Sequence, residues 1–449
     1  MNELSWISRL RIGPERLALT FLLAINMVGV SYRWAWAVAQ PWLGVFWAAP
    51  TLTLLACAVL MLTAAPVSEI GNDRRTDPLV LSAIAFSFVL TLYQTTATRG
   101  VLLAVPALGA GAILLLRFGT VRLLRFGTVR RITDFLVAAA VAWTAYYALQ
   151  GDYQQIGGDL LPIIMAACQN LLHGLDPYTA NYSHVTSNPF FYLPLQWLPY
   201  LPAAALGCDP RVVTVVVFLI FVGVVRLNAG AGMQLHPAML LLALLVTAIG
   251  ARAMARTYML PSWILLACFT FAFAKGQNVV AALLLGCLLA TRQTFVTDAA
   301  AVLVGVVFQM PIRRVFALAA ISALTAVAIL LPFMIYDNAF LWQTFVHGPA
   351  LALAGNSGNI IAAGQVGIVP LLGRLGLGAP SAAVQGTVVL LALAAIGLRR
   401  PKERLSLSLC VAGVDLLTAL SGGQTFEYYW GSSFVIAGTA LCCPPVAEP

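Results

Sequence analysis

Three carboxylates gather in one polar stretch of an otherwise apolar chain. Asp152, Asp159 and Asp176 lie between Arg131 and Arg211, and no lysine or arginine occurs between those two arginines. In a membrane protein, a loop without cations is typical of the face turned away from the cytoplasm. A carboxylate held at the mouth of a helical bundle can take a proton from an acceptor hydroxyl, which is general base catalysis.

Asp159 is the strongest candidate for such a base. Gly157 and Gly158 precede it, and glycines let the backbone bend sharply or come close to a ligand. The segment 160–174 has helical periodicity, so Asp159 could instead cap that helix by accepting hydrogen bonds from its free amides. Both interpretations are open at this point. Asp152 and Asp159 could also share a divalent cation, although no acidic cluster requires a metal.

The composition indicates a protein that crosses a membrane many times. The chain has 449 residues, of which 61% are hydrophobic and 9% charged, whereas average soluble domains are about a quarter charged. Apolar runs such as 315–335 approach the ~20 residues that cross a bilayer. The net charge of +9 comes from short basic loops that set orientation and meet lipid headgroups, so no nucleic-acid partner is expected. We predict an all-α fold, a polytopic membrane helical bundle of roughly twelve transmembrane helices with a partly helical first large outer loop.

Two regions are expected along the chain. Residues 1–131 form an N-terminal four-span bundle that ends in a basic inner loop. Residues 132–449 form the second region, with large outer loops at 150–190 and 336–378. Because basic loops mark the cytoplasmic side, we expect both termini in the cytoplasm and Asp159 on the opposite face.

Phosphate recognition would need cations or hydrogen-bond donors on the same face as Asp159. Histidine meets a phosphate through N–H donation, and the arginine fork suits phosphate. The candidates can equally be ordinary loop residues. No GxxxxGK[ST] or GxGxxG element occurs, which disfavours a nucleotide-sugar donor. The candidates in the two outer loops are His173, His184, His347 and Arg374.

The order of several motifs resembles the integral-membrane GT-C glycosyltransferases, most closely the bacterial family-87, mannosyltransferase-like branch. An outer-loop Asp is followed by a short helix, a Gly-x-x-Pro-Tyr turn and a Tyr/Pro-rich entry into the next span. Further along come a polar break that opens an apolar helix, a Leu-Pro-Phe segment and a last acidic, aromatic turn. The resemblance covers about residues 132 to 440 and departs at its start, where four additional spans precede the Asp. The matching segments are Asp159, Gly174–Tyr178, Phe191–Pro194, Lys275–Asn278, Leu331–Phe333 and Glu427–Tyr429.

This resemblance implies transfer of one sugar from a polyprenyl-phosphate donor to a hydroxyl of a glycan, lipid or protein acceptor. It implies Asp159 as the base, direct displacement with inversion, and an active site on the extracytoplasmic face of a bacterial inner or plasma membrane. The residues expected to bind substrate are Asp152, His173, Asp176, Tyr178, His184, His347, Arg374, Glu427, Tyr428 and Tyr429.

Some charges fall inside apolar runs, where they are expensive, so each is expected to have a partner or a wet cavity. They are Asp415 within 405–420, and Arg292 and Asp298 on either side of a short helix start. Arg292 and Asp298 are more than one helical turn apart, and no pair is predicted.

Two further functions are open. The proline-broken segment 191–202, expected to enter the membrane as a kinked helix, also suits a secondary transporter or a lipid-linked-sugar flippase. Against this, the chain has no long internal repeat. The third possibility is an inactive scaffold or polysaccharide-assembly subunit.

Overall fold

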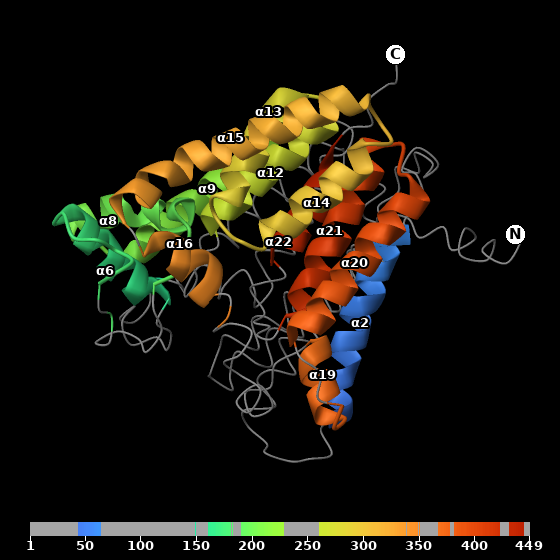
Figure 1. The fold of residues 1–449 in the computed structure, drawn as a ribbon, viewed down its shortest axis with the longest axis horizontal. Coiled ribbons are helices and arrows are strands. Elements are labelled where there is room, and N and C mark those ends of the chain that lie inside the picture. Colours follow the sequence, from blue (N-terminus) through green and yellow to red (C-terminus); the bar gives the residue numbers. More distant parts are fainter. Residues whose placement is uncertain are drawn as a thin grey trace, which may run out of the picture.

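The predicted all-helical fold is confirmed in the computed structural model of the chain. The structure describes residues 44–63, 149, 160–180, 182, 190–228, 260–337, 339–348, 350, 367–377, 381–422 and 431–443, and these contain no strand. The helices, shown in Figure 1, are α2 (Gly44–Thr63), α6 (Leu160–Leu172), α7 (Pro194–Trp197), η5 (Leu198–Tyr200), α8 (Leu201–Leu206), α9 (Pro210–Asn228), α12 (Leu260–Ala274), α13 (Asn278–Leu289), α14 (Phe295–Val306), α15 (Ile312–Tyr336), α16 (Phe340–Trp342), η6 (Gln343–His347), α19 (Ile368–Arg374), α20 (Ser381–Arg399), α21 (Arg404–Ser421) and α22 (Gly431–Cys442).

Four of the described helices are long and apolar enough to cross a bilayer, namely α9, α15, α20 and α21. Helices α12, α13 and α14 are apolar but shorter. A crossing needs ~20 apolar residues, so the chain is a helical membrane protein. The expected total of roughly twelve spans also involves residues outside the described ranges and stays a prediction.

Helix α21 is the centre of the larger core. It packs against α2, α12, α14, α20 and α22, and almost its whole surface is buried. Its small residues let neighbours approach closely: a Cβ added at Gly413 would lie 3.0 Å from the Ala58 carbonyl oxygen of α2. The described part of the N-terminal region therefore packs directly on the second region.

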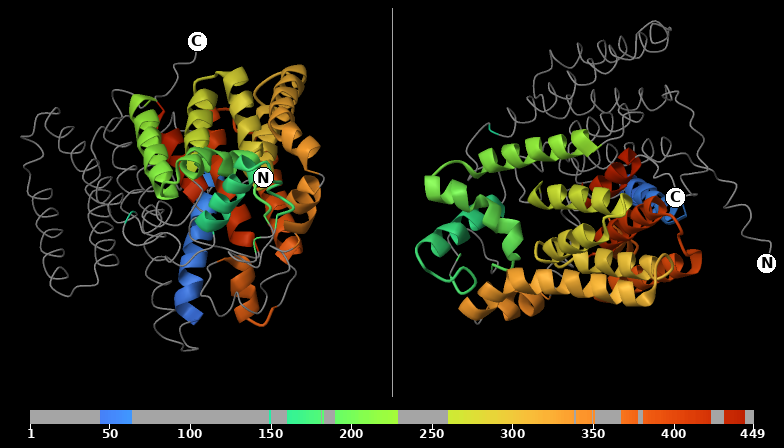
Figure 2. Two further views of the ribbon diagram at one scale, coloured as in Figure 1. Left: turned by 90° about the vertical axis from the view of Figure 1, so that its left-hand side faces the viewer. Right: turned by 90° about the horizontal axis from the view of Figure 1, so that it is seen from above.

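Helices α9, α12, α13 and α15 form a row beside this core. Figure 2 shows them side by side when the molecule is seen from above. Between α13 and α15 the Ser322 hydroxyl donates to the Ala282 carbonyl at 2.8 Å. A hydrogen bond between helices and small residues at the contact are typical of packing within membranes.

The basic residues collect at one end of these helices, which we call the basic end. Lys275 donates to Asn228 at 2.8 Å, Arg404 donates to Asn278 at 2.7 Å and Gln309 donates to the Pro401 carbonyl at 2.9 Å. These contacts join the end of α12 to that of α9, the start of α21 to that of α13, and the segment after α14 to the segment after α20. The cations of this end are Arg226, Lys275, Arg313, Arg314, Arg399, Arg400, Lys402 and Arg404.

The opposite end of the row, which we call the α6 end, holds α6, α7, η5, α8 and α16 (Figure 1). The Leu195 N–H donates to the Ala290 carbonyl at 3.1 Å, and the Gln293 side chain donates to the Thr344 carbonyl at 3.0 Å. The segment 191–202 differs from the single kinked helix that we predicted. Its prolines divide it into α7, η5 and α8, because each removes a backbone donor and restricts the residue before it.

Candidate functional site

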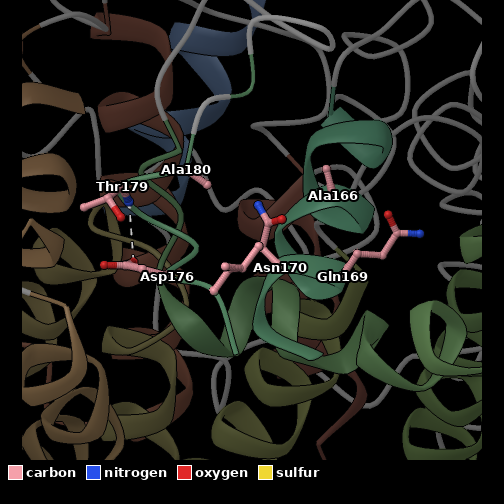
Figure 3. A pocket seen from close by; sticks show the side chains of 7 residues that line it. Ala166, Gln169, Asn170, Asp176, Thr179 and Ala180 are labelled. Atoms are coloured by element: carbon pink, nitrogen blue, oxygen red, sulfur yellow. Dashed lines mark hydrogen bonds between the residues drawn. The ribbon is translucent and has the colours of Figure 1, made fainter. Parts of the chain in front are cut away.

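The turn after α6 carries Asp176. Gly174 has a left-handed backbone with φ 70°, which glycine adopts without steric cost and which ends the helix. The Asp176 carboxylate accepts the backbone N–H of Tyr178 at 2.8 Å and that of Thr179 at 3.4 Å. Figure 3 shows this carboxylate directed away from Asn170 of α6. The turn therefore fixes the carboxylate on the side of the turn away from Asn170.

Asp337 lies directly after α15 and meets this turn. Its Oδ1 accepts the Ala339 N–H at 2.7 Å, whereas Oδ2 has no donor among the described residues. Only 1% of Asp337 is exposed, and the Asp176 carboxyl group lies within hydrogen-bonding distance of it. The neighbouring Tyr336 hydroxyl donates to the Gly174 carbonyl at 2.8 Å. We call Asp176 and Asp337 the acidic pair.

The environment of Asp337 changes its acidity. Burial, followed by the hydrogen bond with Asp176, raises the pKa of Asp337 from 3.8 to about 7. Removal of a carboxylate from water disfavours its charged form, and a second carboxylate nearby does the same. A protonated Asp337 can donate to Asp176, so the acidic pair holds one proton below about pH 7 and is ionised above it. Such a pair can give or take a proton during a reaction.

A cavity of about 410 Å³ lies between α6 and the turn. Its uncharged polar side chains are two carboxamides and one hydroxyl, which can both donate to and accept from hydroxyls, whereas the carboxylate of the lining residue Asp176 is directed away from Asn170. None of the lining residues is a cation, so the cavity suits an uncharged polyhydroxyl group better than a phosphate. The lining residues, most of them labelled in Figure 3, are Ala166, Gln169, Asn170, Leu175, Asp176, Thr179 and Ala180.

Tyr178 holds the turn in place. Its hydroxyl donates to the Tyr192 carbonyl at 2.8 Å and accepts from the Trp197 indole at 3.2 Å. Its ring packs against Phe340, with the ring centroids 4.8 Å apart. Burial raises the pKa of Tyr178 well above its usual value, so the phenol stays neutral. Tyr178 was predicted to bind substrate, but it does not line the cavity and its hydroxyl is used within the protein.

The two described histidines lie near the site without lining the cavity. His173 is exposed after α6, and its Nδ1 lies 2.7 Å from the Gln169 carbonyl. His347 is half-buried in η6, with Nδ1 2.9 Å from the Gln343 carboxamide oxygen. A phosphate-binding role for either residue stays a prediction.

Most of the other predicted site residues lie outside the described part of the chain. The backbone of Arg374 ends α19, but its side chain is likewise outside the description. The expected base therefore stays a prediction, as do the cytoplasmic termini. The residues concerned are Asp152, Asp159, His184, Glu427, Tyr428 and Tyr429.

The sequence analysis missed Asp337 and the grouping of the charges inside apolar helices. Asp337 is the first carboxylate after α15, four residues beyond the Leu-Pro-Phe segment, and that position was the available signal. Arg292 interacts electrostatically with Asp298 and with Asp415, although no pair was predicted for Arg292. The packing of α14 on α21 brings the two carboxylates close together.

Comparison with known proteins found no matching family model, no similar curated protein and no matching solved structure.

Proposed function

We propose that the chain is a membrane glycosyltransferase, which moves one sugar from a polyprenyl-phosphate donor to a hydroxyl acceptor. The observation that carries the proposal is the acidic pair, one member of which belongs to the turn that lines a cavity together with uncharged polar side chains. A carboxyl group that titrates near neutral pH is what general acid–base catalysis needs. The lining of the cavity is suited to the hydroxyls of a sugar or of a glycan acceptor.

The motifs that resemble the GT-C pattern support the proposal because three of them build this one site. Gly174–Tyr178 contacts Phe191–Pro194 through the hydrogen bond from Tyr178 to the Tyr192 carbonyl. Leu331–Phe333 joins them through Phe333, whose ring centroid lies 5.8 Å from that of Trp197. Segments far apart in the sequence thus meet at the α6 end of the bundle.

In the proposed reaction the acceptor oxygen bonds to the anomeric carbon of the sugar while the bond from that carbon to the phosphate oxygen breaks. The acceptor hydroxyl gives its proton to a carboxylate, and polyprenyl phosphate leaves with the bonding electron pair. Attack opposite the leaving group inverts the anomeric configuration. The ionised acidic pair is our candidate for the proton acceptor, and Asp159 is the competing assignment from the resemblance.

A divalent cation is a second expectation for this site. Carboxylate oxygens are ligands that Mg²⁺ prefers, and the Oδ2 atom of Asp337 has no donor among the described residues. The described residues contain no group of three or more His, Cys, Asp or Glu that could hold a metal. A cation would therefore depend on the acidic pair, or on Asp152 and Asp159 outside the described part.

Transfer assays with purified protein test the proposal. Radiolabelled polyprenyl-phosphate sugars are supplied one at a time with Mg²⁺ or with EDTA. We expect Asp337→Asn and Asp176→Asn to lower turnover by roughly 10²–10⁴-fold, the usual loss when a positioned base is removed. Glu403→Gln, which removes a carboxylate at the basic end, is the matched control and should keep wild-type turnover.

Asp159→Asn distinguishes the two candidate bases. Loss of transfer in Asp159→Asn with full turnover in both variants of the acidic pair would assign the base to Asp159 and remove the pair from the mechanism. Failure of every tested sugar donor to react would contradict the proposed activity itself.

Secondary transport or lipid-linked-sugar flipping is the second candidate, and one observation favours it. Asp298 and Asp415 are buried inside the bundle, where transporters keep their coupling sites. Saturable uptake or flipping in reconstituted vesicles, without sugar incorporation into lipid or glycan, would support this function over glycosyl transfer.

A further inference from the structure

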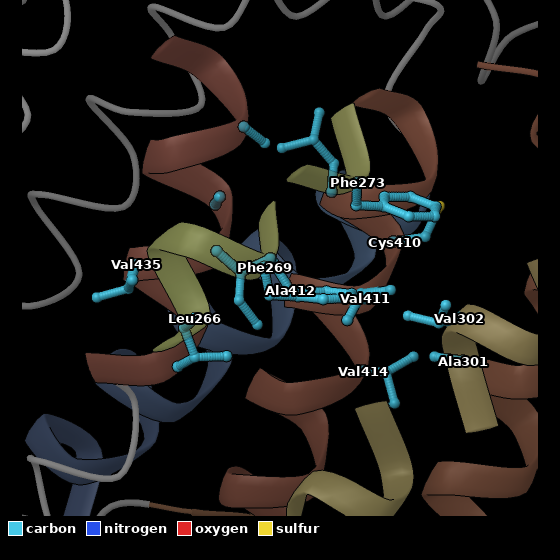
Figure 4. Close-up of a cluster of buried hydrophobic side chains, with 14 of the residues drawn as sticks. Leu266, Phe269, Phe273, Ala301, Val302, Cys410, Val411, Ala412, Val414 and Val435 are labelled. Carbon is cyan, nitrogen blue, oxygen red and sulfur yellow. The ribbon is translucent and has the colours of Figure 1, made fainter. Parts of the chain in front are cut away.

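A polar group lies inside the apolar packing of α14, α21 and α22, away from the acidic pair. Asp298 of α14 is 3% exposed and Asp415 of α21 is 4% exposed, and their carboxylates interact electrostatically. Around them the contact is apolar: Figure 4 shows Val414 of α21 facing Ala301 and Val302 of α14. Charged groups in such a place are expensive unless something compensates them.

The two carboxylates differ in their hydrogen bonds. The Oδ2 atom of Asp415 accepts the hydroxyls of Ser432 and Ser433, each at 2.6 Å. Neither oxygen of Asp298 has a hydrogen-bond partner within the part of the chain that the structure describes. A buried carboxylate whose oxygens accept no hydrogen bond is costly, and a positive ligand would compensate it.

Two threonines bring further oxygens to the same contact. Thr297 and Thr418 lie 3.2 Å apart, oxygen to oxygen, across α14 and α21. The Thr297 hydroxyl donates to the Thr294 carbonyl at 2.7 Å, and the Thr418 hydroxyl donates to the Val414 carbonyl at 2.8 Å. Because each hydroxyl can give its proton to a closer carbonyl, oxygen lone pairs remain for a cation.

The charges fix the valence of the ligand. When both are ionised, Asp298 and Asp415 contribute two negative charges, and Arg292 contributes one positive charge that acts on both. The sum is one negative charge, which a monovalent cation neutralises and a divalent cation would reverse. A proton would satisfy only one oxygen of Asp298, whereas a metal ion can bind both. Hard cations prefer such carboxylate and hydroxyl oxygens.

We propose that Asp298 and Asp415, with the hydroxyls of Thr297 and Thr418, form a binding site for one sodium ion inside the membrane bundle. The ion would hold α14 against α21 by satisfying the oxygens of Asp298. This site is separate from the acidic pair and does not depend on the proposed transferase activity.

The test is thermal unfolding of the purified full chain in NaCl against choline chloride at equal ionic strength. A ligand that binds only the folded state stabilises it by RT ln(1 + [L]/Kd), so we expect the Tm to rise with the logarithm of the sodium concentration above Kd, by about 1–2 °C at tenfold above Kd. Asp298→Asn should abolish this rise. Asp337→Asn, which removes a buried carboxylate at the α6 end, should keep it.

A milder variant tests the same site in case Asp298→Asn does not fold. Thr297→Val keeps the shape of the side chain and should raise the sodium concentration at which the Tm begins to rise about tenfold, the loss expected for one polar contact to a charge. Equal Tm values in sodium and choline would overturn the proposal. So would a folded Asp298→Asn with a wild-type sodium response, or a Tm that follows pH and ignores sodium, which would assign a proton instead.

Discussion

Asp337 and Asp298 are both almost completely buried, but their surroundings differ. Asp337 accepts the Ala339 backbone N–H and lies beside another carboxyl group outside the spans. Asp298 has no hydrogen-bond partner among the described residues and lies beside Asp415 inside the bundle. A buried charge without compensation is costly. We infer that a shared proton compensates Asp337, and in our proposal a sodium ion compensates Asp298.

The raised pKa of Asp337 predicts a pH dependence of stability. The folded state keeps the proton up to about pH 7, whereas the unfolded chain loses it near the ordinary value of 3.8. This contribution to the unfolding free energy is therefore complete below the unfolded pKa and is lost as the pH rises through about 7. Asp337→Asn removes the dependence, so its Tm relative to wild type should increase from pH 5 to pH 8.

Thermal unfolding of both proteins across this pH range checks the prediction. Glu403→Gln should follow the wild-type curve, because that carboxylate lies at the basic end. Parallel curves for Asp337→Asn and wild type would contradict a raised pKa at Asp337.

The sequence predicts one member of the acidic pair better than the other. Asp176 belongs to a local Asp-Pro turn after a short helix, and both features are visible in neighbouring residues. Asp337 has an ordinary position after a long apolar helix. Its importance comes from the packing of α15 against the α6 end, and no local pattern encodes that packing.

At the scale of helices, the close packing of α13 against α15 depends on a glycine at their contact. A Cβ added at Gly286 would lie 2.5 Å from the Ser322 carbonyl oxygen and 2.6 Å from the Thr325 Cβ. The carbonyl belongs to the backbone of α15, so the two helices would have to separate. We expect Gly286→Ala to destabilise the protein by about 1–3 kcal/mol, as overpacking of a core does, with a lower Tm in detergent.

Gly386 of α20 is the matched control, because an added Cβ there has nothing within 4 Å. Gly386→Ala should leave the Tm unchanged or raise it, since alanine is a better helix former by about 1 kcal/mol. An equal Tm for Gly286→Ala and wild type would show that α15 can shift without cost.

Helix ends were more predictable from the sequence than helix neighbours. The expected apolar run at 315–335 corresponds to α15, and the polar break at Lys275–Asn278 does open α13. Hydropathy and polar breaks are local signals, which explains this agreement. The central place of α21 was not predicted, because it depends on small residues that admit several neighbouring helices at once.

At the scale of the whole molecule, the distribution of charged residues indicates which end faces the cytoplasm. The basic end collects eight of the cations in the described residues, whereas the acidic pair lies at the α6 end. Cytoplasmic loops of membrane proteins carry the excess of lysine and arginine. We therefore expect the basic end in the cytoplasm and the acidic pair on the extracytoplasmic face, as the proposed use of a polyprenyl-phosphate donor requires.

Cys208 offers a direct test of this orientation. It is exposed in the turn between α8 and α9 at the α6 end, whereas the other described cysteines are buried or half-buried. A membrane-impermeant maleimide should label Cys208 in intact cells, and Cys208→Ser should remove the label. Lys402→Cys in the Cys208→Ser background places a thiol at the basic end and should react only after permeabilisation. If Lys402→Cys is labelled in intact cells and Cys208 is not, the acidic pair faces the cytoplasm. That result would exclude an extracytoplasmic transfer reaction.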